Sequence, residues 1–295
     1  MDRAGDLLGD IRVTADAEVA NRYRGHLSDR WNVVYAFGGV TMAAATSAAR
    51  THVDDPRYAL RSATATFLSP ITAGAVRFDA RTLRAGKGSR QVAIDMAGEG
   101  AAASAGDEPR SDLHLVATFA PDQPIDTRFT NPVPPDVADP EDIQYEVPSD
   151  YPVHRLNYHR SVEVKTAMGH LPWDPDFEPG AAKWAGWFRF RKTPRLPTGE
   201  LDPLGYIPAA DILGPAMLQK RGPTAEPMLV VSLELSVHFL APTKSEWLLQ
   251  ESEVFQAADG YVSGMVHLWD RDRNLVATGI HRALMRPIDF RKLGR

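Results

Sequence analysis

Segments in which apolar and polar residues alternate recur along most of the chain. In the first half they cover residues 58–68, 75–83, 89–96 and 113–119, and in the second half 183–191, 228–240, 246–257, 261–270 and 275–285. Because alternate side chains of a strand point to opposite faces, each segment presents one apolar face to a core. Short turns rich in Gly and Pro separate neighbouring segments, as in hairpins. The pattern predicts two groups of antiparallel strands.

Two apolar segments lack this alternation and are predicted to be helices. The first follows Gly38-Gly39 and consists largely of Ala, the best helix former. The second lies within residues 202–223, where Pro215 is tolerated only in a first turn. We therefore expect it to begin near Asp211. A carboxylate at the start of so apolar a helix must cap it, pair with a charge or take part in chemistry.

The two halves of the chain repeat each other. Thr64-Ala-Thr-Phe-Leu-Ser-Pro matches Ser236-Val-His-Phe-Leu-Ala-Pro, and the turn Ala85-Gly-Lys-Gly falls on Ala257-Ala-Asp-Gly at the same offset. Further on, Leu115-Val-Ala-Thr matches Leu275-Val-Ala-Thr at a smaller offset. The low-complexity insertion at residues 98–110 accounts for the difference. One insertion thus explains the whole alignment.

This alignment singles out polar residues that only the second half contains. It pairs Asp211 with Gly39, Ser232 with Leu60 and His281 with Pro121. The first-half partners offer no side-chain chemistry. If the protein has a site, we expect the second half to supply its side chains.

Each repeat combines one apolar helix with about four antiparallel strands, which indicates the α+β class. Two such units can join edge to edge as a pseudo-dimer, which removes two exposed sheet edges. We expect a first repeat at residues 1–130, a linker rich in Pro and Asp at 131–152, and a second repeat at 153–295 that carries the site.

Several motifs, taken in order, carry a resemblance to a known family. They are Phe37-Gly-Gly, Phe67-Leu-Ser-Pro, Thr82-Leu-Arg-Ala-Gly-Lys, Val237-His-Phe-Leu-Ala-Pro, Glu246-Trp-Leu-Leu and Leu275-Val-Ala-Thr with Met285-Arg. Together they resemble the acyl-CoA thioesterase II family over nearly the whole chain. The resemblance implies a double hotdog, in which two antiparallel sheets, each wrapped round a central helix, join as a pseudo-dimer.

The resemblance also implies a reaction and its residues. Members of the family hold the water that attacks a thioester with an acid on the helix, a Ser or Thr on the following strand and a Gln on the last strand. Asp211 matches the acid and Ser232 the hydroxyl, whereas His281 stands at the Gln position. A neutral imidazole can hydrogen-bond a water or act as a base. The first half can contribute backbone N–H groups at Gly38 and Gly39 to stabilise an oxyanion.

Each of these residues also has a structural explanation. Asp211 is a favourable N-cap, Ser232 an ordinary strand hydroxyl, and His281 a buried histidine with satisfied hydrogen bonds. Hydrolysis of acyl thioesters is the leading hypothesis. A dehydratase, isomerase or cyclase that moves protons next to a carbonyl is the alternative, as is acyl binding without catalysis.

The composition restricts the remaining classes of function. The 295 residues include no Cys and carry a formal net charge of −5, so thiolate chemistry is absent and nucleic acid is not expected. No segment approaches the ~18 apolar residues of a membrane span, and the N-terminus does not read as a signal peptide. We expect a cytoplasmic protein without metal or redox cofactor. Its partners would be an acyl thioester on coenzyme A or an acyl carrier protein, and free sheet edges could give a homo-oligomer.

Other groups of polar residues are weaker candidates. They are the histidines His154, His159 and His170, the acidic loop Asp174, Asp176 and Glu178, and the basic residues Arg189, Arg191, Lys192 and Arg195. The histidines lack metal-ligand spacing, and the acidic loop is expected to be solvated. The basic residues could meet the phosphates of coenzyme A or simply form a solvated strand end.

Overall fold

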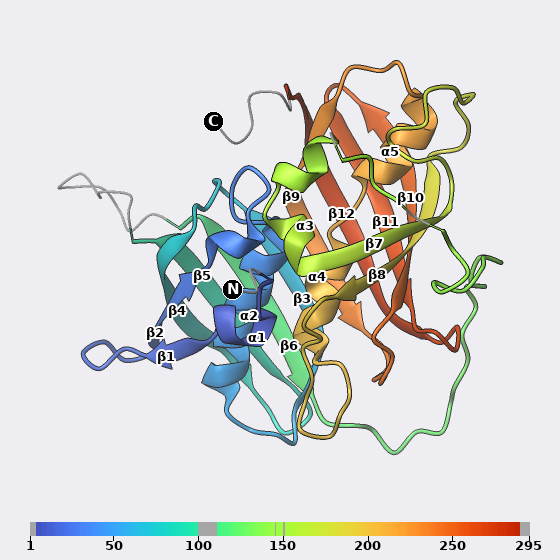
Figure 1. Ribbon diagram of the computed structural model, residues 1–295. Coiled ribbons are helices and arrows are strands. Elements are labelled where there is room, and N and C mark those ends of the chain that lie inside the picture. The colour runs from blue at the N-terminus through green and yellow to red at the C-terminus, as the bar shows by residue number, and fades with distance from the viewer. Residues whose placement is uncertain (1–3, 100–110, 145, 150, 290–295) are drawn as a thin grey trace.

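The strands of the described part of the chain join in one sheet. The computed structural model describes residues 4–99, 111–144, 146–149 and 151–289. The antiparallel sheet has 12 strands in the order β1-β2-β4-β5-β6-β3-β9-β12-β11-β10-β8-β7. The first half of the chain forms one side and the second half the other, with β3 and β9 between them (Figure 1).

The first half places one long helix against six strands. Its elements are α1 (Leu7–Asp10), β1 (Val13–Ala15), β2 (Arg22–Leu27), η1 (Asp29–Trp31), α2 (Gly38–Val53), β3 (Ala59–Phe67), β4 (Gly74–Ala85), β5 (Arg90–Gly98) and β6 (Leu113–Ala120). The second half has shorter helices. Its elements are η2 (Pro152–Arg155), α3 (Tyr158–Ser161), β7 (Val162–Met168), β8 (Lys183–Phe190), η3 (Pro203–Gly205), α4 (Tyr206–Ala210), α5 (Gly214–Arg221), β9 (Met228–Phe239), β10 (Leu248–Ala258), β11 (Tyr261–Trp269) and β12 (Leu275–Pro287).

The seam between the halves lies on a pseudo-two-fold axis. In the β3–β9 pair, Thr64 faces Ser236, and their hydroxyl oxygens lie 2.9 Å apart. These two residues are also equivalent in the sequence repeat. The axis therefore passes between them, and the predicted double hotdog is confirmed as two repeats that share one continuous sheet.

The bulges of the sheet repeat as well. The register shifts between Leu60 and Ser62 in β3 and, at the equivalent place, where Ser232 pairs with Ala283 of β12. It also shifts between Thr82 and Arg84 in β4, and between the equivalent Val254 and Gln256 in β10. A bulge bends a strand and redirects its side chains. The equivalence of Leu60 and Ser232 is thus confirmed.

The predicted equivalence of Pro121 and His281 is wrong. His281 pairs with Leu235 and Gly264, and the equivalents of these two residues, Ala63 and Val92, both pair with Ala117. The first-half counterpart of His281 is therefore Ala117. Aligning the two Leu-Val-Ala-Thr segments displaces the register of the last strand from Ala117 to Pro121, which is an even number of positions. Such a shift leaves every side chain on its proper face of the sheet. Alternation therefore could not reveal the error.

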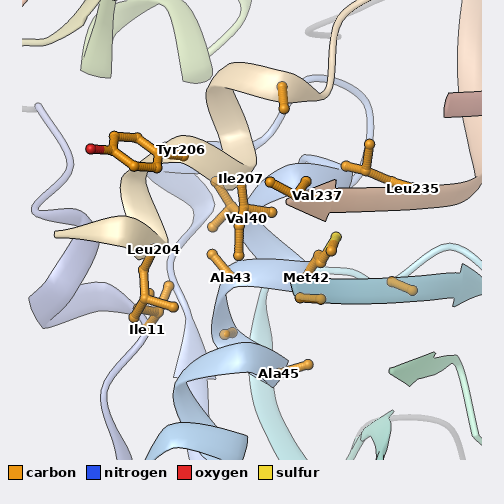
Figure 2. Close-up of a cluster of buried hydrophobic side chains, with 14 of the residues drawn as sticks. Ile11, Val40, Met42, Ala43, Ala45, Leu204, Tyr206, Ile207, Leu235 and Val237 are labelled. Atoms are coloured by element: carbon orange, nitrogen blue, oxygen red, sulfur yellow. The ribbon is translucent and has the colours of Figure 1, made fainter. Parts of the chain in front are cut away.

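Helix α2 lies in the main core, where it contacts strands of the first repeat and α4 of the second. Its buried face includes Ala43, Ala44, Ala45 and Ala48, whose small side chains let neighbouring elements approach closely. Val40 lies next to Ile207 of α4, with Val237 of β9 alongside (Figure 2). The central core thus contains residues of both halves.

The second helix does not begin at Asp211 as predicted. Helix α4 ends at Ala210, Asp211 has non-helical angles (φ −88°, ψ 63°), and α5 begins at Gly214. Pro215 explains the break, because a proline lacks the N–H that would bond the carbonyl four residues earlier, and its ring clashes with that carbonyl. The carbonyl in question belongs to Asp211. The N-cap of α5 is Leu213, so Asp211 does not cap this helix.

A strap formed by residues 137–143 covers part of the sheet face opposite the helices. Val137 and Ile143 pack on a cluster that includes Trp187, Trp247 and Trp269. The indole of Trp187 donates to the carbonyl of Ala138 at 2.8 Å. This part of the predicted linker is therefore packed on the second repeat. Among the described residues, no helix has the length and apolar character needed to span a membrane.

Candidate active site

Three elements of the second repeat bring Asp211, Ser232 and His281 together. Asp211 occupies the break between α4 and α5, Ser232 lies on β9 at the bulge, and His281 lies on β12. The Ser232 hydroxyl donates to Asp211 Oδ1 at 2.7 Å, and His281 Nε2 lies 3.0 Å from Ser232 Oγ. His281 Nε2 also lies 3.4 Å from Asp211 Oδ1. The side chains predicted from sequence thus form one hydrogen-bonded group.

The first repeat closes this group with the N-terminus of α2. A Cβ placed on Gly38 would lie 2.8 Å from Asp211 Oδ2 and 3.5 Å from Ser232 Oγ. A Cβ on Gly39 would lie 2.6 Å from the Cα of Pro208 and 3.0 Å from Asp211 Cβ. Only glycine permits so close an approach of the two helix ends. The carboxylate therefore lies at the start of α2, where the helix dipole favours a negative charge.

The hydrogen bonds assign the proton positions. Ser232 has one hydroxyl proton, and the Asp211 carboxylate can only accept. His281 must therefore donate from Nε2 to Ser232 Oγ, and its buried Nδ1 has no partner among the described residues. Burial lowers the pKa of His281 below its usual 6.5, and the Asp211 carboxylate opposes this only in part. At neutral pH the imidazole is thus uncharged, with its proton on Nε2.

The equivalent positions of the first repeat are all without a functional side chain. With the corrected register they are Gly39, Leu60 and Ala117. Ala117 is fully buried. Among the described residues, such a group of polar side chains is therefore present at one of the two pseudo-equivalent positions and missing from the other.

The weaker candidates from sequence do not assemble into a site. The Arg189 guanidinium pairs with Glu163 at 2.7 Å and stacks on Trp247, and Arg195 pairs with Glu246 at 2.9 Å. His170 stacks on Phe177. Within the described ranges, no group of three or more His, Asp or Glu side chains could hold a metal ion.

A separate hollow of about 620 Å³ lies at the other end of α2. It is lined by side chains such as His52, Arg57 and Arg90. The two arginines share the carboxylate of Asp55, at 2.8 and 2.9 Å. This carboxylate offsets one of their two positive charges. We place the chemistry at Asp211, where three polar side chains are joined by hydrogen bonds.

The structure adds residues that the sequence did not identify. Gln250 and Ser252 of β10 are buried beneath the helix break and donate to backbone carbonyls there. Tyr158 packs against Phe37 with ring centroids 4.4 Å apart and ring planes tilted by 39°, and burial together with the Asp211 carboxylate raises the pKa of Tyr158. The sequence did contain a signal for Gln250 and Ser252, because both are polar residues at positions of the strand that the alternation directs towards the core.

Comparisons with known proteins agree with this arrangement. Residues 27–119 match the acyl-CoA thioesterase N-terminal domain, and residues 132–285 match the acyl-CoA thioesterase C-terminal domain. Fold and site together define a double hotdog protein of the thioesterase class. The two domain matches cover most of the sequence, and the chain belongs to the acyl-CoA thioesterase family.

Solved structures share the fold at low sequence identity. A hot dog fold protein of unknown function from Alicyclobacillus acidocaldarius is 19% identical with a TM-score of 0.77, over 96% of this chain and 98% of that one. An acyl-CoA thioesterase II from Mycobacterium marinum is 19% identical with a TM-score of 0.67, over 96% and 99%. The dehydratase domain of RzxB from Pseudomonas fluorescens is 12% identical with a TM-score of 0.52, over 94% and 97%. A search of curated proteins found no match.

Proposed function

We propose that the protein hydrolyses acyl thioesters with a water activated by Asp211. The observation that carries this proposal is the shared hydrogen bonding at Ser232, which receives the His281 N–H and donates to Asp211 Oδ1. This leaves Asp211 Oδ2 free to face the backbone of Gly38. A carboxylate oriented in this way can take a proton from a water beside it.

The reaction balances with these groups alone. The water oxygen attacks the thioester carbonyl carbon, and Asp211 receives one water proton. The C–S bond then breaks, and the thiolate takes up that proton, which leaves a carboxylic acid and a thiol. The first amides of α2, at Gly38 and Gly39, have no intrahelical acceptor and can stabilise the developing oxyanion.

His281 stands where the family has Gln, and it can still supply an N–H donor to Ser232. A Gln amide would offer an N–H donor, and a neutral imidazole protonated on Nε2 also offers one. Because Nε2 already donates to Ser232, we assign His281 to holding the hydroxyl and not to accepting the water proton. This favours hydrolysis over the Asp/His proton transfer of a dehydratase or isomerase.

The substrate is proposed to be an acyl group on coenzyme A, in keeping with the family, with an acyl carrier protein as the second possibility. Partly buried apolar residues such as Ile212 and Val230 belong to the core around the helix break, where an acyl chain would be accepted. Assays with the same acyl group on both carriers separate the two.

The test is free thiol release from a panel of acyl-CoAs. Asp211→Asn should reduce kcat by roughly 10²- to 10⁴-fold, because it removes the general base while keeping the shape of the side chain. Asp270→Asn is the matched control, since Asp270 is also buried and hydrogen-bonded but accepts from Thr243 and Asn274 away from the site. Full activity of Asp211→Asn would refute the assigned role. Mass spectrometry distinguishes the alternatives, because hydrolysis separates acyl group from thiol whereas dehydration removes only water.

A further inference from the structure

The helix break that positions Asp211 leaves backbone carbonyls without helical partners. Interrupting a helix frees the carbonyls of its last turn, and a buried carbonyl without a donor is costly. Two side chains of β10 supply donors. Gln250 Nε2 donates to the carbonyl of Ala209 at 2.6 Å, and Ser252 Oγ donates to the carbonyl of Ile212 at 3.1 Å.

These two contacts lie on either side of Asp211 in the chain. Gln250 is 1% exposed and Ser252 is 0% exposed, so neither side chain can exchange its bond for one to bulk water. Gln250 Oε1 has no partner within the described part of the chain. Gln250 therefore bears the cost of an unpaired buried oxygen while its amide donates to Ala209. A purely structural filler at this position would be apolar.

The pseudo-symmetry shows what the fold itself requires at these positions. The first-repeat equivalents of Gln250 and Ser252 are Phe78 and Ala80, which occupy the same places in the β4–β5 register. There they face α2, which runs unbroken from Gly38 to Val53. Where the helix is continuous the strand carries apolar residues, and where it is broken at the acid the strand carries donors.

We propose that Gln250 and Ser252 are positioning residues that hold the break between α4 and α5 and thereby aim the Asp211 carboxylate. The expected loss of kcat rests on the proposed hydrolysis, whereas the effect on the position of Asp211 does not depend on turnover. Neither side chain touches the water or the thioester. Each acts through the backbone on one side of Asp211.

The kinetic test uses Ser252→Ala and Gln250→Met in the full chain. We expect kcat to fall roughly 10- to 100-fold in each, because a small misplacement of a catalytic group has effects of this size. KM should stay within about twofold, because substrate contacts are unchanged. Ser252→Thr should restore kcat, since it keeps the hydroxyl. Thr46→Val is the matched control, because Thr46 is equally buried and donates to the Met42 carbonyl at 2.8 Å within α2.

A second measurement reads the geometry without turnover. The Asp211 carboxylate lies 3.4 Å from His281 Nε2, so the ring senses the position of this charge. If the break shifts, the ¹⁵N and ¹H resonances of the His281 ring should move in Ser252→Ala and Gln250→Met but not in Thr46→Val. Wild-type protein without hydrolysis would refute the proposed function and leave this readout intact. Unchanged His281 resonances in both variants, or wild-type kcat in both, would overturn the positioning role.

Discussion

The buried histidine predicts how the stability of the protein depends on pH. His281 is 2% exposed, its Nδ1 lacks a partner among the described residues, and burial lowers its pKa below 6.5. Protonation would place a charge on a ring that is almost wholly removed from bulk solvent, although Asp211 lies close by. The site is therefore built for a neutral imidazole, which fits its proposed role as a donor to Ser232.

A pH series with His281→Gln tests this assignment. Well above pH 6.5 both folded and unfolded states hold a neutral His281, so this residue makes no pH-dependent contribution. As the pH falls below 6.5, the unfolded state takes up the proton first, and the folded state loses stability until its own lower pKa is reached. Wild type should therefore lose up to about 1.4 kcal/mol per pH unit more than the variant below pH 6.5.

Urea unfolding between pH 7.5 and 5 measures the difference directly. Other histidines with lowered pKa, such as His52 and His159, are present in both proteins and cancel. Parallel stability curves would contradict a neutral buried His281. At pH 7 the variant should keep most of the proposed hydrolytic activity, because Gln retains an N–H donor at this position.

At the scale of elements, the site depends on two helix ends that nearly touch. Gly39 and Asp211 are equivalent residues of the two repeats, and a Cβ added to Gly39 would lie 2.6 Å from the Cα of Pro208 and 3.0 Å from the Cβ of Asp211. The packing of the two helix ends therefore requires glycine at position 39. The same requirement leaves the first repeat without a carboxylate at this position.

Gly39→Ala should destabilise the protein and impair catalysis together. The new Cβ would lie 2.6 Å from the Cα of Pro208, and this backbone contact cannot be relieved by a rotamer change. We expect a loss of about 1–3 kcal/mol, as for overpacked cores, with a fall in kcat as the helix ends separate. Gly214→Ala is the control, because no atom lies within 4 Å of its added Cβ. Equal stability of the two variants in urea unfolding would show that the helix ends are not in tight contact.

At the scale of the whole molecule, the repeats share a sheet and a core. Strands β3 and β9 pair across the seam, α2 packs on α4, and the main buried cluster draws residues from both halves. The chain between them contains Ile125 and Phe129, which are 74% and 79% exposed. The two halves are therefore held together by the shared sheet and core, and not by this connecting segment.

Cutting the chain between Ile125 and Phe129, at an inserted protease site, should leave both pieces associated and active. The cut removes no residue of the seam, the core or the site. Size-exclusion chromatography should show one peak at the mass of the uncut protein, and denaturing electrophoresis should show two bands. Thermal unfolding should remain a single transition, because both halves lose the shared core at once. Separation of the pieces without denaturant would refute the shared core.

The sequence by itself determined the strands, the repeat and the polar residues unique to the second half. Alternation is local, so it identifies the strands of each hotdog without knowledge of their partners. The repeat was readable because both copies keep the motif around Thr64 and Ser236. Comparison of the copies then isolated Asp211, Ser232 and His281, which the structure places in hydrogen-bond contact.

Only the tertiary structure decided the register and the geometry of the site. A shift by an even number of residues preserves the face of every side chain, so the sequence could not show that Ala117 is the counterpart of His281. The sequence showed Pro215, but it did not show that a separate helix, α4, precedes the break at Asp211 and that α5 follows it. The donors Gln250 and Ser252 became interpretable once the break gave them carbonyls to bind. Each of these features depends on contacts between segments distant in the chain, which a local pattern of polarity does not encode.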